Sequence, residues 1–266
     1  MRRAPRAVRL GGVIDPRIIA HRGYAGRYPE NTRASVLAAV EYGAAAVEID
    51  VQLTRDGEVV LFHDRDLVRV CGAKGAIHQR SLAELGALRV REPERLAPFG
   101  PAVALVREPI ATLADLATEL AARRAPPRLF VEVKRVAVEA HGVERVCDAV
   151  LEAAAPLEGR FVIISFSLEV IERVRALGAV PIGPILEDFG AIDSKRARAL
   201  SPEWTFCNRE RLPEGADPGA FDTRLAVYEV VDPAEARALF ERGVDAVETF
   251  ELEALSRGLR ALEAHS

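Results

Sequence analysis

The sequence predicts an α/β fold, a (β/α)8 TIM barrel with a β-hairpin and a long loop over the carboxyl ends of its strands. Short apolar segments alternate with longer amphipathic ones along the 266 residues, an order typical of a parallel sheet covered by helices. Eight such segments within this length fit one closed barrel. A doubly wound open sheet is the alternative, and it is disfavoured because no Gly-x-Gly-x-x-Gly follows the first strand.

The predicted strands are short and rich in β-branched residues, and the segments between them have helical periodicity. The eight strands are expected at 18–21, 46–51, 129–134, 161–165, 180–186, 204–207, 225–231 and 244–248. The helices are expected at 32–42, 112–123, 142–154, 168–177, 192–200, 233–242 and 252–263. We expect one domain over residues 1–266, with the order or disorder of residues 1–15 left open.

Two stretches depart from this alternation. The segment TRDG at 54–57 is a turn signal between apolar arms at 48–53 and 58–62, which predicts a hairpin. Its second arm runs antiparallel and therefore lies above the barrel rim. The other stretch, 64–110, is rich in glycine and proline, and only 81–88 looks helical, with Ser81 as N-cap and Glu84 three residues later. We expect this insertion to cover the active site.

Composition excludes several classes of function. The chain has 36 Lys and Arg against 40 Asp and Glu, a net charge of −4, which argues against nucleic acid as a partner. Its three cysteines are far apart and form no Cys-x-x-Cys pair, so a disulfide framework is not expected. No apolar run is long enough to span a membrane, and no secretory signal is recognised, so we expect a cytoplasmic location.

Polar side chains gather at the carboxyl ends of the first strands, where barrel enzymes have their active sites. Residues two apart on a strand share a face, so Glu48 and Asp50 point the same way, as do Glu132 and Lys134. The hairpin returns His63 to the same place. The expected cluster consists of His21, Arg22, Glu48, Asp50, His63, Glu132 and Lys134.

These residue types suit phosphate chemistry. Three carboxylates offer oxygen ligands that favour one divalent cation, Mg²⁺ or Ca²⁺. Arg22 and Lys134 are suited to bind a phosphate, and His21 and His63 to act as general acid and base. The cluster therefore predicts phosphodiester cleavage. Neither a Gly-x-Ser-x-Gly elbow nor a Walker A sequence is present, which disfavours esterase and NTPase functions.

At these residues the sequence resembles the glycerophosphodiester phosphodiesterase family. The matching segments are IIAHRGYAGRYPENTRASVLAAVEYGAAAVEIDVQLTRDGEVVLFHD at 18–64, SLAEL at 81–85, ATLADL at 111–116, VEVK at 131–134, SFS at 165–167 and RLAVYEVVDPAEARALFERGVDAVET at 224–249. The resemblance implies a TIM barrel, a divalent cation and hydrolysis of a small-molecule glycerophosphodiester to glycerol 3-phosphate and an alcohol. It assigns catalysis to His21 and His63, metal binding to Glu48, Asp50 and Glu132, and phosphate binding to Arg22 and Lys134.

The sequence departs from the family pattern near its end. Where the family usually has Trp-Thr-Val-Asn, this chain has Tyr228-Glu229-Val230-Val231, and Tyr228 is expected to keep an aromatic wall for the substrate. Glu248-Thr249-Phe250 replaces an ending in Thr-Asp. Glu229 and Glu248 have two interpretations: outward salt bridges to arginines, or a changed pocket that favours a cationic alcohol such as choline or ethanolamine. Residues 30–32 are interpreted mainly as a helix entry, with Asn31 or Thr32 as its cap.

Two other functions remain open. A lysophospholipase D acting on monoacyl glycerophospholipids would need an apolar surface beside the mouth, and Leu96, Phe99, Val103 and Leu105 offer candidates. A non-catalytic binder of a phosphate ligand is the other, although binding alone would not need both histidines. A nuclease conflicts with the acidic balance of charge. The preferred alcohol, the preferred metal and the oligomeric state do not follow from the sequence.

Overall fold

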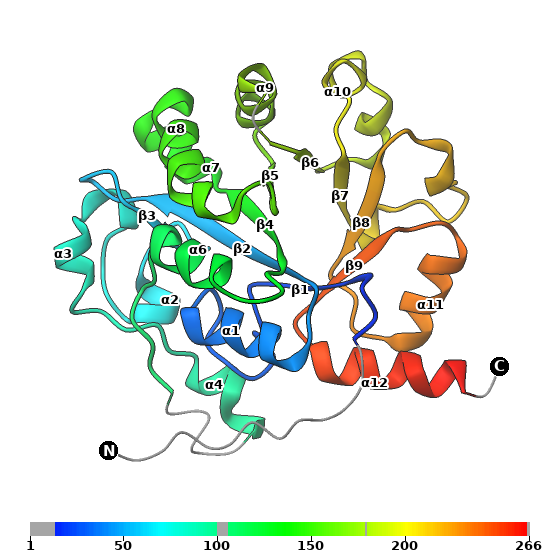
Figure 1. Ribbon diagram of the computed structural model, residues 1–266, viewed down its shortest axis with the longest axis horizontal. Helices are drawn as coiled ribbons and strands as arrows, with labels where there is room; N and C mark the ends of the chain where they lie inside the picture. The colour runs from blue at the N-terminus through cyan, green and yellow to red at the C-terminus, as the bar shows by residue number, and fades with distance from the viewer. Residues whose placement is uncertain (1–13, 100–105, 179, 265–266) are drawn as a thin grey trace.

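The structure is a computed structural model that describes residues 14–99, 106–178 and 180–264. One sheet contains the strands in the order β1-β9-β8-β7-β6-β5-β4-β2-β3, and pairing of β1 with β2 closes it into a barrel (Figure 1). Every pairing is parallel except that of β2 with β3. The strands are β1 (Ile18–Ala20), β2 (Ala46–Leu53), β3 (Val59–Leu61), β4 (Arg128–Val133), β5 (Phe161–Ser165), β6 (Ile182–Leu186), β7 (Trp204–Asn208), β8 (Arg224–Tyr228) and β9 (Ala246–Thr249). The predicted eight-stranded barrel with its hairpin is therefore confirmed.

Helices lie outside the barrel, as predicted (Figure 1). They are α1 (Arg33–Tyr42), α6 (Leu113–Ala121), α7 (Arg135–His141), α8 (Val143–Ala154), α9 (Leu168–Leu177), α10 (Lys195–Leu200), α11 (Pro233–Glu241) and α12 (Leu252–Glu263). Helix α7 was not predicted. It is short and follows β4 directly, and Gly142, with a φ of 82°, separates it from α8. The segment expected as one helix at 192–200 instead divides at Ser194, which caps α10 after the 3-10 helix η4 (Phe189–Asp193).

The insertion after the hairpin contains more helix than its sequence indicated. Besides α3 (Leu82–Leu85) with the expected Ser81–Glu84 capping box, it contains α2 (Val68–Cys71), η1 (Ile77–Gln79), α4 (Pro93–Leu96) and η2 (Ala97–Phe99). These turns are too short to show helical periodicity, which is why the sequence indicated one helix only. Apolar side chains of this segment pack against the hairpin in one cluster. The cluster consists of Val60, Phe62, Leu67, Val70, Ile77, Leu85, Val90 and Ile110.

Two apolar layers lie on opposite sides of the barrel wall. The outer layer packs the strands against the helices. The inner layer fills the barrel towards the amino ends of the strands, and its centre is Phe130, whose ring meets Trp204 and Phe206 edge-on with centroids 5.1 and 5.3 Å apart. Polar residues follow these apolar ones along the same strands. The inner layer therefore forms an apolar floor beneath the carboxyl-end opening.

The hairpin returns the chain to this opening. Val51 of β2 pairs with Leu61 of β3, and the backbone N–H of Phe62 donates to the carbonyl of Asp50 over 2.9 Å. The Gln52 side chain then donates to the carbonyl oxygens of Phe62 and Asp64, at 3.1 and 2.7 Å. These bonds hold His63 next to the polar end of β2, as the position of the turn predicted.

Some expectations fall on residues that the structure does not describe. Within 1–15 only Ile14 and Asp15 are described, and Ile14 is buried against the outer layer. Among the apolar residues considered for a lipid groove, Leu96 is buried. The side chain of Phe99, together with Val103 and Leu105, lies outside what the structure describes. In the described part of the chain, no helix combines the length and the apolarity that crossing a bilayer requires.

We expect Phe130→Ala to lower the free energy of unfolding by about 3–5 kcal/mol, because it opens a cavity at the centre of the inner layer. Urea unfolding followed by circular dichroism measures this change. Val68→Ala is the control, since Val68 is 56% exposed and should cost less than about 0.5 kcal/mol. A loss below about 1 kcal/mol for Phe130→Ala would mean that the barrel floor is not closely packed.

Candidate active site

Three carboxylates converge inside the barrel at the ends of β2 and β4. Glu48 and Asp50 lie two residues apart on β2, and Asp50 is the register partner of Glu132 on β4. All three are buried, and one oxygen of each lies within 4.8 Å of the others. The structure therefore brings these three predicted residues together, on the shared face that the spacing indicated.

Two cations compensate this charge unevenly. Lys134 Nζ lies 3.0 Å from Asp50 Oδ1 and 2.7 Å from Glu132 Oε1, and Arg22 Nε lies 3.3 Å from Asp50 Oδ2. Burial alone would raise the pKa of Asp50, but Lys134 and Arg22 hold it well below its ordinary value. Glu48 accepts no hydrogen bond from a lysine or arginine side chain of the described residues, so burial and the charge of Asp50 raise its pKa well above the ordinary value. Burial likewise raises the pKa of Glu132.

The loop between β1 and α1 wraps around this cluster. Arg22 and Asn31 have φ angles of 55° and 51°, in the left-handed region that side chains other than glycine seldom occupy. This turn points the backbone N–H of Arg22 at Glu48 Oε2, 2.9 Å away. Gly23, with a φ of 77°, also needs its small size, because a Cβ atom there would lie 2.5 Å from Ser35 Oγ. The strained turn brings one backbone donor to a buried carboxylate.

Asn31 is a site residue that the interpretation as a helix entry missed. Its Nδ2 donates to Asp50 Oδ2 over 2.7 Å, and its Oδ1 accepts from the backbone N–H of Asp50 over 2.9 Å. The N-cap is Thr32, whose side chain accepts from the N–H of Ser35 in a capping box, so that part of the prediction is confirmed. Asn31 therefore orients Asp50 instead of capping α1.

Glu30 was also missed, and it links the site to the insertion. It accepts from Arg22 Nη1 over 2.9 Å and from Arg69 Nη2 over 2.5 Å. Burial opposes its ionisation, but Arg22 and Arg69 outweigh burial and lower its pKa. Its backbone N–H donates to Glu92, which also pairs with Arg95. Glu30 lies within the segment 18–64 that resembles the family and could have been recognised there, whereas no sequence pattern pointed to Arg69, Glu92 or Arg95.

His63 has a carboxylate partner of its own. Its Nδ1 lies 2.8 Å from Asp64 Oδ1, and Arg69 holds Asp64 through two hydrogen bonds of 2.6 and 2.9 Å. Burial would raise the pKa of Asp64, but its bonds to His63 and Arg69 lower it well below the ordinary value. Glu30, His63 and Asp64 have oxygen and nitrogen atoms within 4.8 Å of one another, but Arg69 already pairs with both acids, which makes this group unsuited to a metal.

His21 lies at the end of β1, with 11% of its side chain exposed. Its Nε2 is 3.7 Å from Glu48 Oε2, and its Nδ1 is 3.5 Å from Glu229 Oε2. Its ring stacks on Phe250, with centroids 4.5 Å apart and planes inclined by 7°. Burial lowers the pKa of His21, against the opposing effect of Glu229. The neutral imidazole is therefore the favoured form here.

Glu229 and Glu248 lie inside the opening, so the expectation of outward salt bridges to arginines is wrong. Strand β8 ends at Tyr228, which leaves Glu229 free to reach His21, while Glu248 of β9 is only 3% exposed. Burial and the charge of Glu132 raise the pKa of Glu248 well above its ordinary value. Parity could have revealed Glu248, since it lies two residues after Ala246, which belongs to the inner layer.

Tyr228 packs on the inner layer at the end of β8, half-buried. Burial raises the pKa of its hydroxyl, and the nearby Glu248 and Glu132 add to this effect. The hydroxyl is therefore neutral. The ring faces the barrel interior, which is the position expected for an aromatic wall.

The carboxylate cluster has the chemistry of a divalent metal site. It presents hard oxygen donors from three side chains, and Glu48 Oε1 is buried without a hydrogen-bond partner in the described structure. Together with Glu248, four buried carboxylates face Arg22 and Lys134, so a cation would relieve an excess of negative charge. Glu248 belongs to neither group of ligand atoms that lie within 4.8 Å of one another.

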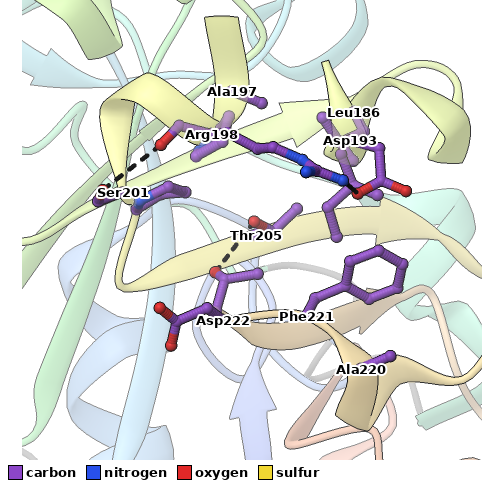
Figure 2. A pocket seen from close by; sticks show the side chains of 13 residues that line it. Leu186, Asp193, Ala197, Arg198, Ser201, Thr205, Ala220, Phe221 and Asp222 are labelled. Atoms are coloured by element: carbon purple, nitrogen blue, oxygen red, sulfur yellow. Dashed lines mark hydrogen bonds and ion pairs between the residues drawn. The ribbon is translucent and has the colours of Figure 1, made fainter. Parts of the chain in front are cut away.

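A separate cavity of about 360 Å³ lies between β6, β7 and α10 (Figure 2). It contains none of the predicted site residues. Arg198 pairs with Asp193 at 2.6 Å, the hydroxyls of Thr205 and Thr223 lie 3.1 Å apart, and Asp222 is exposed at its edge. We therefore assign the chemistry to the carboxyl-end opening and none to this cavity.

Comparison with known proteins identifies the family to which this chain is similar. The glycerophosphoryl diester phosphodiesterase family matches residues 21–250. A phosphodiesterase of Oleispira antarctica, solved in complex with the product sn-glycerol-3-phosphate, is 25% identical with a TM-score of 0.78 and covers 92% of this chain and 97% of its own. A glycerophosphodiester phosphodiesterase of Thermotoga maritima is also 25% identical, with a TM-score of 0.68 over 93% of this chain and 98% of its own.

The curated relatives are aligned with this chain over a smaller share of their length than the solved structures are. A Mycobacterium tuberculosis protein named "Probable glycerophosphodiester phosphodiesterase 1" is 34% identical over 178 residues, which are 64% of this chain and 62% of that protein. Human glycerophosphodiester phosphodiesterase 1 is 30% identical over 61% of this chain and 47% of its own. The chain thus spans about three fifths of the length of the first of these relatives and about half of the second.

The role of Asn31 can be tested by two substitutions that separate its hydrogen bonds from its backbone conformation. Asn31→Gly keeps the positive φ but removes both bonds to Asp50, and should cost about 2–3 kcal/mol of unfolding free energy. Asn31→Ala should cost about 1 kcal/mol more, because alanine resists the left-handed region. Chemical unfolding measures both changes. An alanine variant as stable as the glycine variant would contradict the strained conformation.

Proposed function

Because the chain belongs to the glycerophosphoryl diester phosphodiesterase family, we propose that it hydrolyses glycerophosphodiesters to sn-glycerol 3-phosphate and an alcohol. One observation carries this proposal. Two histidines, each with a carboxylate at Nδ1, lie in the same opening as the three carboxylates and two cations. A binder of phosphate would not need a carboxylate behind each imidazole, so this arrangement favours the enzyme over the non-catalytic alternative.

Glu48, Asp50 and Glu132 would hold one divalent cation, Mg²⁺ or Ca²⁺. Both ions prefer carboxylate oxygen, and Glu48 retains a buried oxygen without a partner. When bound, the cation supplies Lewis-acid polarisation of a phosphoryl oxygen. It would also compensate the charge that Lys134 and Arg22 leave unmatched at Glu48.

Arg22 and Lys134 would bind the phosphate. Arg22 has five N–H donors, and its side chain directs Nη1 at Glu30 and Nε towards Asp50. Lys134 has three donors and directs two at Asp50 and Glu132. Each cation therefore keeps donors for phosphate oxygens while its carboxylate partners hold its position. We propose that Tyr228 forms the apolar wall beside the substrate.

The two histidines would move the protons. One accepts a proton from the nucleophile, either water or the adjacent glycerol hydroxyl, as its oxygen bonds to phosphorus. The bond from phosphorus to the leaving oxygen breaks, and the other histidine protonates that alkoxide. If the glycerol hydroxyl attacks, a cyclic phosphate forms first, and water then opens it to glycerol 3-phosphate. Either His21 or His63 can take either role in this scheme.

We expect His21→Ala and His63→Ala each to lower the kcat for release of glycerol 3-phosphate from glycerophosphocholine by about 10²–10⁴-fold, since each removes one proton-transfer group. Circular dichroism should show the fold unchanged. The matched control is Glu241→Gln, a 70% exposed position at the end of α11. Near wild-type kcat in either histidine variant would contradict the assignment.

Removal of the metal provides an independent test. Protein stripped with EDTA should release no glycerol 3-phosphate, and Mg²⁺ or Ca²⁺ should restore release because the carboxylates no longer oppose the phosphate. Isothermal titration should show one ion per chain, bound at least about tenfold more weakly by Glu48→Gln. Full activity without metal would contradict the metal site.

A lysophospholipid offered in the same assay distinguishes the lysophospholipase D alternative. Turnover of the lysolipid alone, without turnover of glycerophosphocholine or glycerophosphoethanolamine, would favour that alternative. The cytoplasmic location remains a prediction.

A further inference from the structure

The surroundings of His21 fix its ring on more than one side. Phe250 stacks against one face, and the two ring nitrogens each point towards a carboxylate, Glu48 at Nε2 and Glu229 at Nδ1. Nδ1 is buried and has no other polar partner in the described structure. A buried imidazole nitrogen without a partner is costly, so the nearest acceptor, Glu229, is its natural partner.

Glu229 is itself held in position. Its Oε1 accepts a hydrogen bond of 2.9 Å from the backbone N–H of Phe250, which leaves Oε2 facing His21. The same residue, Phe250, therefore stacks on the imidazole with its side chain and orients the carboxylate with its backbone. These contacts join the ends of β1, β8 and β9 around one ring.

His63 provides a comparison within the same site. Its Nδ1 lies 2.8 Å from Asp64, which Arg69 holds in place. His21 has the same relation to Glu229, at the longer distance of 3.5 Å. Hydrogen bonds of this kind are often long before substrate binds and shorten in the substrate complex. The two carboxylates come from unrelated places, since Asp64 follows His63 directly whereas Glu229 follows β8.

We propose that Glu229 is a positioning residue for His21: its carboxylate accepts the Nδ1–H bond and selects the tautomer whose unprotonated Nε2 faces the carboxylate cluster. This inference rests on the proposed function, in which one histidine accepts a proton, and it assigns that role to His21 through Nε2. It also assigns a role to a position where the chain departs from its family pattern. The competing role, a subsite for a cationic alcohol, would leave Nδ1 of His21 without an acceptor.

Two substitutions separate positioning from packing. In Glu229→Gln, the Phe250 N–H still requires the amide oxygen, so the NH₂ group turns towards His21 and favours the opposite tautomer. Glu229→Ala removes the partner and leaves the tautomer unselected. We therefore expect both variants to lower kcat by about 10²-fold or more, with glutamine no milder than alanine and KM within about threefold of wild type. A packing role predicts the reverse order, because glutamine preserves the shape of glutamate.

Nuclear magnetic resonance provides a readout that does not depend on activity. Long-range ¹H–¹⁵N spectra of metal-free protein with ¹⁵N-labelled histidine report which imidazole nitrogen carries the proton. His21 should be protonated at Nδ1 in wild type and in the control Glu241→Gln, and at Nε2 in Glu229→Gln. The signal of His21 is assigned by its loss in His21→Ala.

Three results would overturn the proposal. The first is a wild-type His21 protonated at Nε2, and the second is a Glu229→Gln variant clearly more active than Glu229→Ala. The third is a rise in the KM of the Glu229 variants for glycerophosphocholine and glycerophosphoethanolamine but not for glycerophosphoglycerol. The last result would assign Glu229 to the cationic headgroup. Absence of turnover by the wild type on every glycerophosphodiester would contradict the proposed function instead, and the tautomer measurement would still test the positioning role.

Discussion

Burial of carboxylates inside the barrel is the constraint on which the rest of this structure depends. Glu48, Asp50 and Glu132 lie between an apolar floor and the opening, where an unpaired buried charge costs several kcal/mol. Lys134, Arg22 and Asn31 all gather around Asp50, which remains ionised. Glu48 accepts one backbone hydrogen bond but none from a lysine or arginine side chain of the described residues, and this imbalance is what makes the cluster suited to a cation.

The unusual backbone around the site follows from that constraint. Arg22 can direct its backbone N–H at Glu48 and its side chain at Asp50 and Glu30 only because the chain turns sharply after β1. The positive φ angles of Arg22 and Asn31 are the conformational cost of that turn. Hydrogen bonds from Asn31 to Asp50 and the capping box of Thr32 offset it.

The insertion after the hairpin supports the site from the side. Arg69 of α2 joins Asp64 to Glu30, so the partner of His63 and the partner of Arg22 share one guanidinium. The apolar cluster beneath α2 and α3 packs these helices against the hairpin, and Arg69 extends from α2. Each histidine thus depends on a different part of the fold, His63 on the insertion and His21 on the last two strands.

The sequence by itself determined the barrel, its eight parallel strands and the cluster of seven polar residues at their ends. The barrel and its strands follow from the alternation of apolar and amphipathic segments along the chain. The cluster follows from the shared face of strand residues two apart, such as Glu48 and Asp50. The sequence did not predict helix α7 or the short helical turns of the insertion, because they are too short to show helical periodicity. Only the tertiary structure decided that Asn31 orients Asp50, that Arg69 joins Glu30 to Asp64, and that Glu229 faces His21. These contacts join residues far apart in the chain, and no local pattern encodes which side chains the closed barrel brings together.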